Sequence, residues 1–192
     1  MTKSRTTTLG VLLAAGSGSR FDAPHHKLLA PMGSSTVIEH SLSALLAAGL
    51  DGVVVVTGSA DLSAVLQAVP TVHNPRWASG QRSSVECALT YASEHSYGAV
   101  VIGLADQPFI TPEAWKSLAE SDAAIAVATY DGKRGNPVRL DASVWPLFFA
   151  TTGDPDSGAR TLMHLHPELV REVACKGNSA DIDTTEDLSK WT

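Results

Sequence analysis

The segment "LLAAGSGSRFDAPHHK", Leu12 to Lys27, sets the course of the chain. An aliphatic run ends at Gly16 and gives way to small residues, one arginine and a closing lysine. The apolar residues 9–14 are typical of a strand that is covered on both faces. A strand that ends in a glycine-rich loop beside two cations is a candidate anion site, because glycine lets backbone N–H groups come close to an anion.

Two common phosphate-binding loops do not match this segment. "GSGSRF" lacks the third glycine of the dinucleotide-binding fingerprint, and the residues from Gly16 to Lys27 lack the GK[ST] ending of a P-loop. Taken alone, the segment is equally consistent with an ordinary connection from a strand to a helix that carries a solvated arginine and lysine. The rest of the chain has to decide between these interpretations.

Strand and helix patterns alternate along the first half of the chain. Buried strands are predicted at 9–14, 53–57, 71–73 and 99–106, and helices with one apolar face at 36–48, 62–69 and 84–95. This order predicts right-handed crossovers and a three-layer α/β/α fold with a mostly parallel, Rossmann-like sheet. Ligands of such sheets bind beyond the carboxyl ends of the strands, which points to the loop after Ala14 and to Asp106.

The second half of the chain has a different pattern. Apolar runs at 125–130 and 134–140 flank Asp131-Gly132, a frequent turn pair, and predict an antiparallel hairpin. Short helices are expected at 144–149 and 159–164. Thr184, three residues before Asp187, is a helix-start signature near the end of the chain.

Length and composition restrict the function classes. We expect a single domain over residues 1–192, and a formal net charge of −6 without a block of basic residues argues against DNA or RNA as a partner. No apolar run is long enough for a membrane span or a secretory signal. Cys87 and Cys175 form neither a metal pair nor a disulfide framework, and both suit a reducing compartment, so a cytoplasmic protein is expected.

The strand followed by A-A-G-x-G-x-R, a lysine and "LLAPMG" resembles the signature of the MobA-like nucleotidyltransferases, which are related to the enzymes of molybdenum cofactor biosynthesis. In that family the signature reads approximately L-A-A-G-x-S-x-R-M-G-x-x-K-x-L-L, and its loop wraps the phosphates of the nucleotide. The resemblance implies a fold of the nucleotide-diphospho-sugar transferase type. It also implies nucleotide contacts by Ala14, Ala15, Gly16, Ser17, Gly18, Ser19, Arg20 and Lys27, with catalytic roles for Arg20 and Lys27. Phe21-Asp22 stands where the family has Met-Gly, and the spacing to Lys27 is longer.

"LADQP", residues 104–108, places Asp106 at the end of a predicted buried strand, which Pro108 keeps from continuing. Such an aspartate either caps a turn or binds a divalent cation, since Mg²⁺ prefers a few carboxylate oxygens together with water and substrate phosphates. The segment resembles the L-x-D-x-P motif of the same family. The resemblance implies that Asp106 is a catalytic metal ligand beside the nucleotide.

"DIDTTED", residues 181–187, supplies two further carboxylates. Asp181 and Asp183 are two residues apart and lie on the same side if the segment is extended. The segment resembles the D-I-D-T-P-E-D motif of the family, with Thr185 in place of proline. This resemblance implies Asp181 as the second metal ligand, with Asp183 in reserve, whereas Glu186 and Asp187 are explained by the dipole at a helix N-terminus.

"NPRWASGQRSSV", residues 74–85, resembles the W-x-x-G-x-x-S-S stretch that lies beside the nucleotide in the family. The resemblance implies nucleotide contacts by Gly80, Ser83 and Ser84. Either serine alone is equally well explained as the N-cap of a helix. The four tryptophans are scattered and are expected to be packing anchors.

"RGNPV" and "DSGAR" resemble the R-G-x-P-V and G-D-x-G-A-R motifs on the acceptor side of the family, with Pro155 where the second motif has glycine. The resemblance implies an acceptor site built by Arg134, Gly135, Pro137, Asp156, Gly158 and Arg160. Guanidinium groups suit bidentate contacts to phosphate, so the two arginines are candidates for holding the incoming phosphate. Surface ion pairs are the alternative role for both.

Five segments in family order imply a Mg²⁺-dependent nucleotidyltransferase that moves CMP from CTP to molybdopterin cofactor and releases pyrophosphate. The implied partners are the nucleotide, a molybdopterin-type acceptor, and a molybdoenzyme or its chaperone. Ala15 favours CTP, because the guanylyl branch usually has L-A-G-G at this place. A guanylyltransferase, a transferase for a phosphorylated sugar or deazaflavin precursor, and a nucleotide-binding oxidoreductase or chaperone without transfer activity remain as alternatives.

Overall fold

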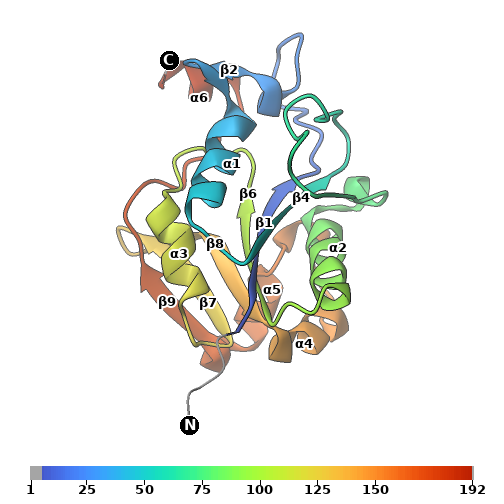
Figure 1. Cartoon of the computed structure of the whole chain (residues 1–192), viewed down its shortest axis with the longest axis vertical. Helices are drawn as coiled ribbons and strands as arrows, with labels where there is room; N and C mark the ends of the chain where they lie inside the picture. Colours follow the sequence, from blue (N-terminus) through green and yellow to red (C-terminus); the bar gives the residue numbers. More distant parts are fainter. Residues whose placement is uncertain (1–5, 192) are drawn as a thin grey trace.

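The computed structural model, which describes residues 6–191, is built on a seven-stranded sheet in the order β5-β4-β1-β6-β8-β7-β9 (Figure 1). The strands are β1 (Thr8–Ala14), β4 (Gly52–Thr57), β5 (Thr71–His73), β6 (Ala99–Leu104), β7 (Ile125–Tyr130), β8 (Lys133–Asp141) and β9 (Val170–Ala174). Strands β5, β4, β1 and β6 are mutually parallel, whereas β8 runs antiparallel to both β6 and β7. The predicted mostly parallel sheet with an antiparallel hairpin in the C-terminal half is confirmed.

Helices cover both faces of the sheet, as Figure 1 shows. They are α1 (Val37–Ala47), α2 (Gln81–Glu94), α3 (Pro112–Ala119), α4 (Trp145–Ala150), α5 (Arg160–Leu165) and α6 (Thr185–Ser189). Side chains of β1 alternate between two apolar layers: Leu12 packs with α1 and α3, while Val11 and Leu13 pack with α2, α4 and α5. A strand buried on both faces explains the continuous apolar run that precedes the glycine-rich loop.

The predicted helix boundaries are close to the observed ones where the sequence carries end signals. Helix α1 follows Thr36, whose backbone N–H donates to Glu39 Oε2 at 2.7 Å, and Gly49 just past its end has φ of +66°. Helix α6 begins after Thr184, whose hydroxyl accepts from the backbone N–H of Asp187. Capping side chains satisfy N–H groups that the helix itself leaves without partners.

The helix predicted at 62–69 is wrong. Leu62 and Leu66 are buried, but the segment forms two separate turns, in which Leu66 N–H donates to the Leu62 carbonyl and Val69 N–H donates to the Leu66 carbonyl. Asp61 accepts from the backbone N–H of Ser63 and stabilises a turn in place of a helix start. Two apolar residues four apart are therefore buried without a continuous helix.

Several elements were not predicted from the sequence. These are helix α3, strand β9 and the small hairpin of β2 (Pro31–Met32) and β3 (Ser35–Thr36). Strand β6 also ends at Leu104, two residues before the predicted end, so Asp106 lies in the turn that follows. Across residues 6–191, the helices are too short or too polar to cross a bilayer.

Candidate active site

The glycine-rich loop after β1 forms one wall of a cavity of about 610 Å³ beyond the carboxyl ends of the parallel strands. Residues 16–20 line it together with Ala14 and Lys27. The Gly16 carbonyl accepts from Ser59 Oγ at 2.7 Å and from His26 Nε2 at 3.1 Å. These hydrogen bonds hold the start of the loop to the segment after β4 and to the residue before Lys27. The implied nucleotide residues of this segment therefore surround one space, except that Ala15 is buried beneath the loop.

His26 has a defined tautomer within the loop. Its Nδ1 accepts from the backbone N–H of Leu28, so Nε2 carries the proton that is donated to Gly16. Burial lowers the pKa of His26, the hydrogen bond to Gly16 opposes this, and the neighbouring charge of Lys27 lowers the pKa further. The neutral imidazole is therefore the form that the loop holds.

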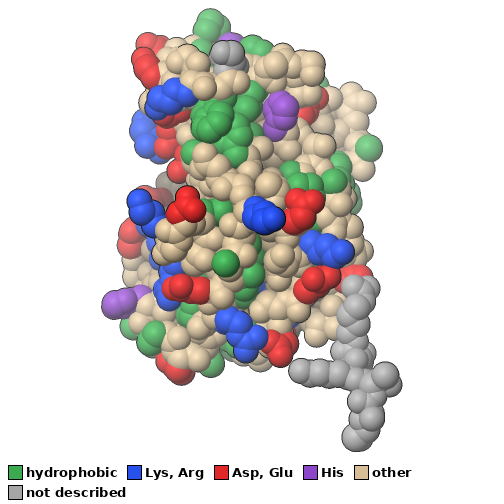
Figure 2. Space-filling view, turned by 90° about the vertical axis from the view of Figure 1, so that its left-hand side faces the viewer, with side chains coloured by type: hydrophobic (Ala, Val, Ile, Leu, Met, Phe, Trp, Pro, Cys, Tyr) green, Lys and Arg blue, Asp and Glu red, His purple; other side chains and the backbone are tan. Residues whose placement is uncertain are grey.

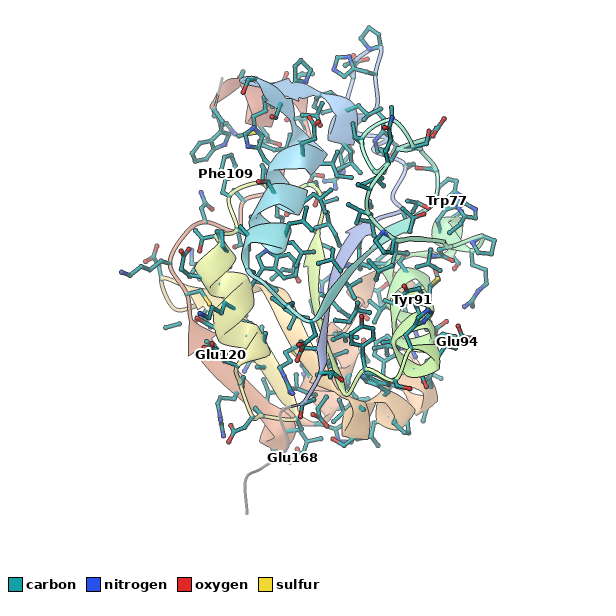
Figure 3. The ribbon with its side chains drawn as sticks, viewed as in Figure 1. Trp77, Tyr91, Glu94, Phe109, Glu120 and Glu168 are labelled. Atoms are coloured by element: carbon teal, nitrogen blue, oxygen red, sulfur yellow. The ribbon has the colours of Figure 1, made fainter. Side chains whose placement is uncertain are left out.

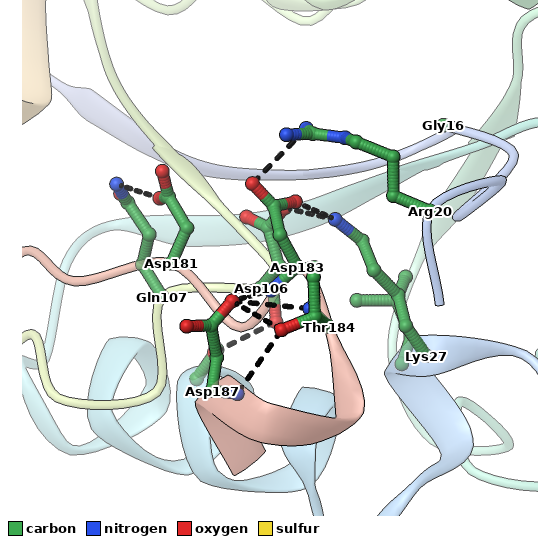
Figure 4. A network of polar contacts seen from close by, with 12 residues as sticks. Gly16, Arg20, Lys27, Asp106, Gln107, Asp181, Asp183, Thr184 and Asp187 are labelled. Atoms are coloured by element: carbon green, nitrogen blue, oxygen red, sulfur yellow. Dashed lines mark hydrogen bonds and ion pairs between the residues drawn. The ribbon is translucent and has the colours of Figure 1, made fainter. Parts of the chain in front are cut away.

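Lys27 connects two acidic segments that are far apart in the sequence. Its Nζ lies 2.6 Å from Asp106 Oδ2 and 2.9 Å from Asp183 Oδ1 (Figure 4). Arg20 reaches Asp183 from the loop, with 3.0 Å between Nη2 and Oδ2, and its side chain is 73% exposed. Burial acts to lower the pKa of Lys27, but the charges and hydrogen bonds of Asp106 and Asp183 outweigh it, and the pKa is raised.

The chain end reaches this place through one buried residue. Ile182 is fully buried, and its backbone N–H donates to the Asp106 carbonyl at 2.8 Å. Asp181 and Asp183 flank it and both line a second cavity, as expected for alternate residues of an extended segment. Packing of Ile182 in the core is thus what carries both carboxylates to the end of β6.

Asp181 lies on the other side of Asp106 from Lys27. Its Oδ1 accepts from Gln107 Nε2 at 2.6 Å. Burial raises the pKa of Asp181, the charge of Asp106 adds to this, and the hydrogen bond from Gln107 opposes it. The charges of the two implied metal ligands, Asp106 and Asp181, therefore act on each other. Asp183 is the acid that shares Lys27 with Asp106.

The acidic group formed by Asp106, Asp181 and Asp183 has one feature that fits a divalent cation. Asp106 Oδ1 is buried and has no hydrogen-bond partner within the described part of the chain. Such an oxygen is costly unless it is paired, and a hard cation prefers oxygen ligands of this kind. As arranged, with Lys27 between Asp106 and Asp183, the side chains of residues 6–191 form no cluster of three or more His, Cys, Asp or Glu that could hold a metal.

The segment before α2 closes the first cavity from the opposite side. Gly80 has φ of +105°, and a Cβ at this residue would lie 2.7 Å from the Pro155 carbonyl oxygen. Gly80 and Ser84 line the cavity, whereas the hydroxyl of Ser83 donates to backbone carbonyls and accepts from the buried Asn74. Ser83 is thus placed behind the wall that Gly80 and Ser84 form.

Trp77 and Gln81 also line the first cavity, although neither was predicted as a site residue. Trp77 lies above α2 near the end of β4 (Figure 3). A Cβ at Gly58 would lie 2.7 Å from Trp77 Cβ and 2.8 Å from Ala15 Cβ, so these two side chains approach each other over a glycine. The prediction that the tryptophans are packing anchors omitted this position at the cavity wall.

The second cavity, of about 720 Å³, has a different character. Its apolar floor is formed by Val85, Ile102, Val127, Val138 and Met163. Arg134, Gly135 and Arg160, the residues that the resemblance implied for an acceptor site, lie at its polar side. Arg134 Nε pairs with Glu172 at 2.7 Å, and Arg160 donates to the carbonyls of Asp156 and Ser157.

Three further residues implied for the acceptor site lie elsewhere. Asp156 lines the first cavity beside Gly80. Gly158 has φ of +54°, and a Cβ there would approach the side-chain amide of Gln81. Pro137 follows a cis peptide bond within β8, next to Val138 of the cavity floor. The loop that contains Pro155 thus contacts the nucleotide-side segment.

The two cavities meet at the acidic group. The residues that line both are Arg20, Gln81, Leu104, Asp106 and Asp183. A ligand in either cavity would therefore lie beside Arg20 and the carboxylates of Asp106 and Asp183. On the face of the molecule in Figure 2, Lys and Arg side chains are interspersed with Asp and Glu.

Comparisons with known proteins identify relatives of similar sequence and fold. The family model described as MobA-like NTP transferase domain matches residues 10–172. The crystal structure of Rv0371c from Mycobacterium tuberculosis H37Rv is 27% identical, with a TM-score of 0.81 over 97% of this chain and 98% of that chain. Another structure of Rv0371c is described as a complex with manganese, with 26% identity and a TM-score of 0.76 over 97% of this chain and 98% of that chain.

Two further similarities complete the comparison. A nucleotidyl transferase from Methanothermobacter thermautotroptrophicus (Mth528) shares the fold, with 22% identity and a TM-score of 0.82 over 96% of this chain and 95% of that chain. The bifunctional protein GlmU of Halorhodospira halophila (strain DSM 244 / SL1) is 35% identical over 116 residues, which are 58% of this chain. That match covers 24% of GlmU, so the chain corresponds to about a quarter of this curated relative.

Proposed function

The chain belongs to the MobA-like NTP transferase family and is a nucleotidyltransferase, and from this premise we propose that it transfers CMP from CTP to a molybdopterin-type acceptor in a Mg²⁺-dependent reaction. Pyrophosphate is the other product. The observation that carries the proposal is the meeting of two cavities at Arg20, Asp106 and Asp183. A transferase of this kind needs two substrate spaces that share one charged boundary.

The first cavity suits the nucleoside triphosphate. The loop at 16–20 offers backbone N–H groups, and Arg20 and Lys27 stand at its open and buried sides with exposed fractions of 73% and 12%. Both cations pair with carboxylates in the free protein. On binding, they donate to phosphate oxygens, because phosphoryl transfer depends on positioning and on neutralising charge.

Asp106 and Asp181 are the residues that would hold Mg²⁺, with Asp183 as a further carboxylate nearby. The unpartnered Asp106 Oδ1 and the burial of Asp181 support this assignment. When bound, the cation neutralises charge that develops between the α-phosphate and the leaving pyrophosphate. A phosphate oxygen of the acceptor, already ionised near neutral pH, is the attacking group, so the protein does not need a covalent nucleophile.

The second cavity suits an acceptor with a flat ring system and a phosphate. The aliphatic floor, which includes Ile102, Val127 and Met163, offers surface to the face of a ring, while Asn136, Ser157 and Ser179 of the same cavity offer polar groups to its edge. Arg134 and Arg160 at its polar side match a phosphate. A pterin-type acceptor, which has a flat ring with a polar edge and a phosphate, is compatible with this distribution.

The preference for CTP is based on Ala15. Its side chain is buried close to Gly58 and Trp77, and of these three residues Trp77 is the one that lines the first cavity. We infer that a methyl group behind this wall leaves less room for a base than glycine would. A pyrimidine is the smaller base and fits this arrangement better than guanine.

Release of pyrophosphate from purified protein tests the proposal. The protein is mixed with MgCl₂ and molybdopterin cofactor, and CTP and GTP are compared. We expect pyrophosphate release when the nucleotide and the molybdopterin cofactor are both present. We also expect a higher kcat/KM for CTP than for GTP. A higher value for GTP would overturn the base assignment. Release with sugar 1-phosphates but not with the pterin acceptor would overturn the acceptor assignment.

A further inference from the structure

A line of side-chain amides connects the acceptor-side cavity with the carboxylate of Asp181. Asn136 Nδ2 donates to Gln107 Oε1 at 3.1 Å, and Gln107 Nε2 donates to Asp181 Oδ1 at 2.6 Å and to the Ser179 carbonyl at 3.1 Å. Asn136 belongs to β8, and its carbonyl accepts from Tyr130 on β7 at 2.8 Å. All three amide and carboxylate residues line the second cavity.

Gln107 has one consistent orientation in this line. Its side chain is buried, with 5% exposed, and both amide hydrogens and the amide oxygen have partners. A carboxylate and a backbone carbonyl only accept, so the NH₂ group must face Asp181 and Ser179. The oxygen is then left for the NH₂ group of Asn136. Figure 4 shows the contact between Gln107 and Asp181 beside the Asp106 group.

We propose that Gln107 is a positioning residue of the transfer reaction, which holds the Asp181 carboxylate in register with Asn136 on the wall of the acceptor cavity. The inference rests on the proposed function. Because the line starts on the hairpin of β7 and β8 and ends on the segment 179–181, Gln107 connects two parts of the site. An acceptor seated against Asn136 is thereby aligned with the carboxylates at the end of β6.

Variants of Gln107 separate positioning from packing. Gln107→Met keeps the length and burial of the side chain but removes the amide. We expect kcat to fall by about 10- to 100-fold, the range seen when a partner of a ligating side chain is removed, with KM for CTP within about 3-fold of wild type. Gln67→Met, at an exposed glutamine in the turn before β5, is the control and leaves kcat unchanged.

Asn136→Asp tests the direction of the hydrogen bonds from Asn136 through Gln107 to Asp181. An aspartate offers only acceptors to Gln107, whose amide then has to rotate and turn its oxygen toward Asp181. We expect a loss of kcat similar to that of Gln107→Met. Unchanged kcat in either variant would overturn the proposal.

A double-mutant cycle with Asp181→Asn decides whether Gln107 acts through Asp181. Gln107→Met should add less than about 2-fold to the loss in the Asp181→Asn background. Losses that multiply in full would mean that Gln107 acts independently, and the proposal would be wrong. Thermal unfolding of each variant reports any general effect on stability.

The same double-mutant cycle can be measured without an acceptor, through the binding of Mn²⁺ in the presence of CTP. The concentration of free Mn²⁺ is followed by electron paramagnetic resonance for wild type, both single variants and the double variant. We expect weaker binding in Gln107→Met and no further weakening in the Asp181→Asn background. If the acceptor assignment is wrong, turnover fails while this pattern persists. Equal Mn²⁺ affinity in wild type and Gln107→Met overturns the positioning role itself.

Discussion

Lys27 Nζ and Asp106 Oδ2 lie 2.6 Å apart although the residues are 79 positions apart in the sequence. The same ammonium group lies 2.9 Å from Asp183 Oδ1. One largely buried cation therefore holds the turn after β6 and the chain end against the first loop. The charges that would meet a triphosphate are paired with each other before it arrives, so the site is assembled in the free protein.

Replacing Lys27 by methionine removes the cation that both acids share. We expect turnover to fall by at least about 100-fold, the effect of losing one charge-stabilising donor in a transition state. The melting temperature changes by only a few degrees, because the site borders two cavities that admit water. Pyrophosphate release and thermal unfolding check both statements. Lys116→Met, at an exposed lysine 3.9 Å from Glu120, is the matched control and should retain full activity.

Asp106→Asn keeps the shape of the side chain and removes its charge. We expect turnover to fall by orders of magnitude while the fold is retained, because metal affinity and the pairing with Lys27 are both lost. Mn²⁺ binding should weaken in parallel. The control is Asp131→Asn in the hairpin turn, where φ is +49° and asparagine is well tolerated. Full activity of Asp106→Asn would contradict the metal assignment.

Gly80→Ala introduces a methyl group where no space exists. The new Cβ would lie 2.7 Å from the Pro155 carbonyl oxygen, and φ of +105° is unfavourable for alanine. We expect a loss of about 1–3 kcal/mol in the free energy of unfolding and weaker CTP binding, since the segment lines the nucleotide cavity. Gly49→Ala has φ of +66° but open space around its Cβ. It should lose less stability and keep its CTP affinity, as measured by denaturation and calorimetry.

The pKa of His26 makes the loop sensitive to acid. Burial, with a further effect of the Lys27 charge, keeps this pKa below the ordinary value of 6.5 despite the hydrogen bond to Gly16. A depressed folded-state pKa means that stability is present above about 6.5 and is lost as pH falls through the folded-state value. The melting temperature of wild type should therefore drop more between pH 7.5 and 5.5 than that of His26→Asn. Asparagine still offers an acceptor to the Leu28 N–H. Identical pH profiles would contradict this account.

Much of the fold followed from local sequence patterns. The apolar run before Gly16, the helix-start signature at Thr184 and the Asp131-Gly132 turn predicted the strand, the last helix start and the hairpin that the structure shows. The prediction at 62–69 was wrong because two leucines four residues apart satisfy helical spacing whether or not the backbone continues as a helix. Packing in the core, and not a helix, accounts for the burial of Leu62 and Leu66 in two successive turns.

The sequence predicted which residues belong to the candidate site better than it predicted the contacts between them. Asp106, Asp181 and Asp183 could be named because each lies in a motif, and their positions beyond β6 agree with the rule for parallel sheets. That Lys27 would join Asp106 to Asp183 in the free protein was not visible in the motifs. Gln107 lies inside "LADQP", yet its role depends on Asn136, a residue 29 positions away.

The sequence by itself determined the strand and helix pattern, the glycine-rich loop and the residue types that a triphosphate requires, because these depend on the identity and spacing of near neighbours. Only the tertiary structure decided which charges pair. Lys27 and Asp183 are 156 positions apart, and they meet because Ile182 is buried against the turn that follows β6. Distances between such segments are set by packing of the whole core, which a short sequence motif does not specify.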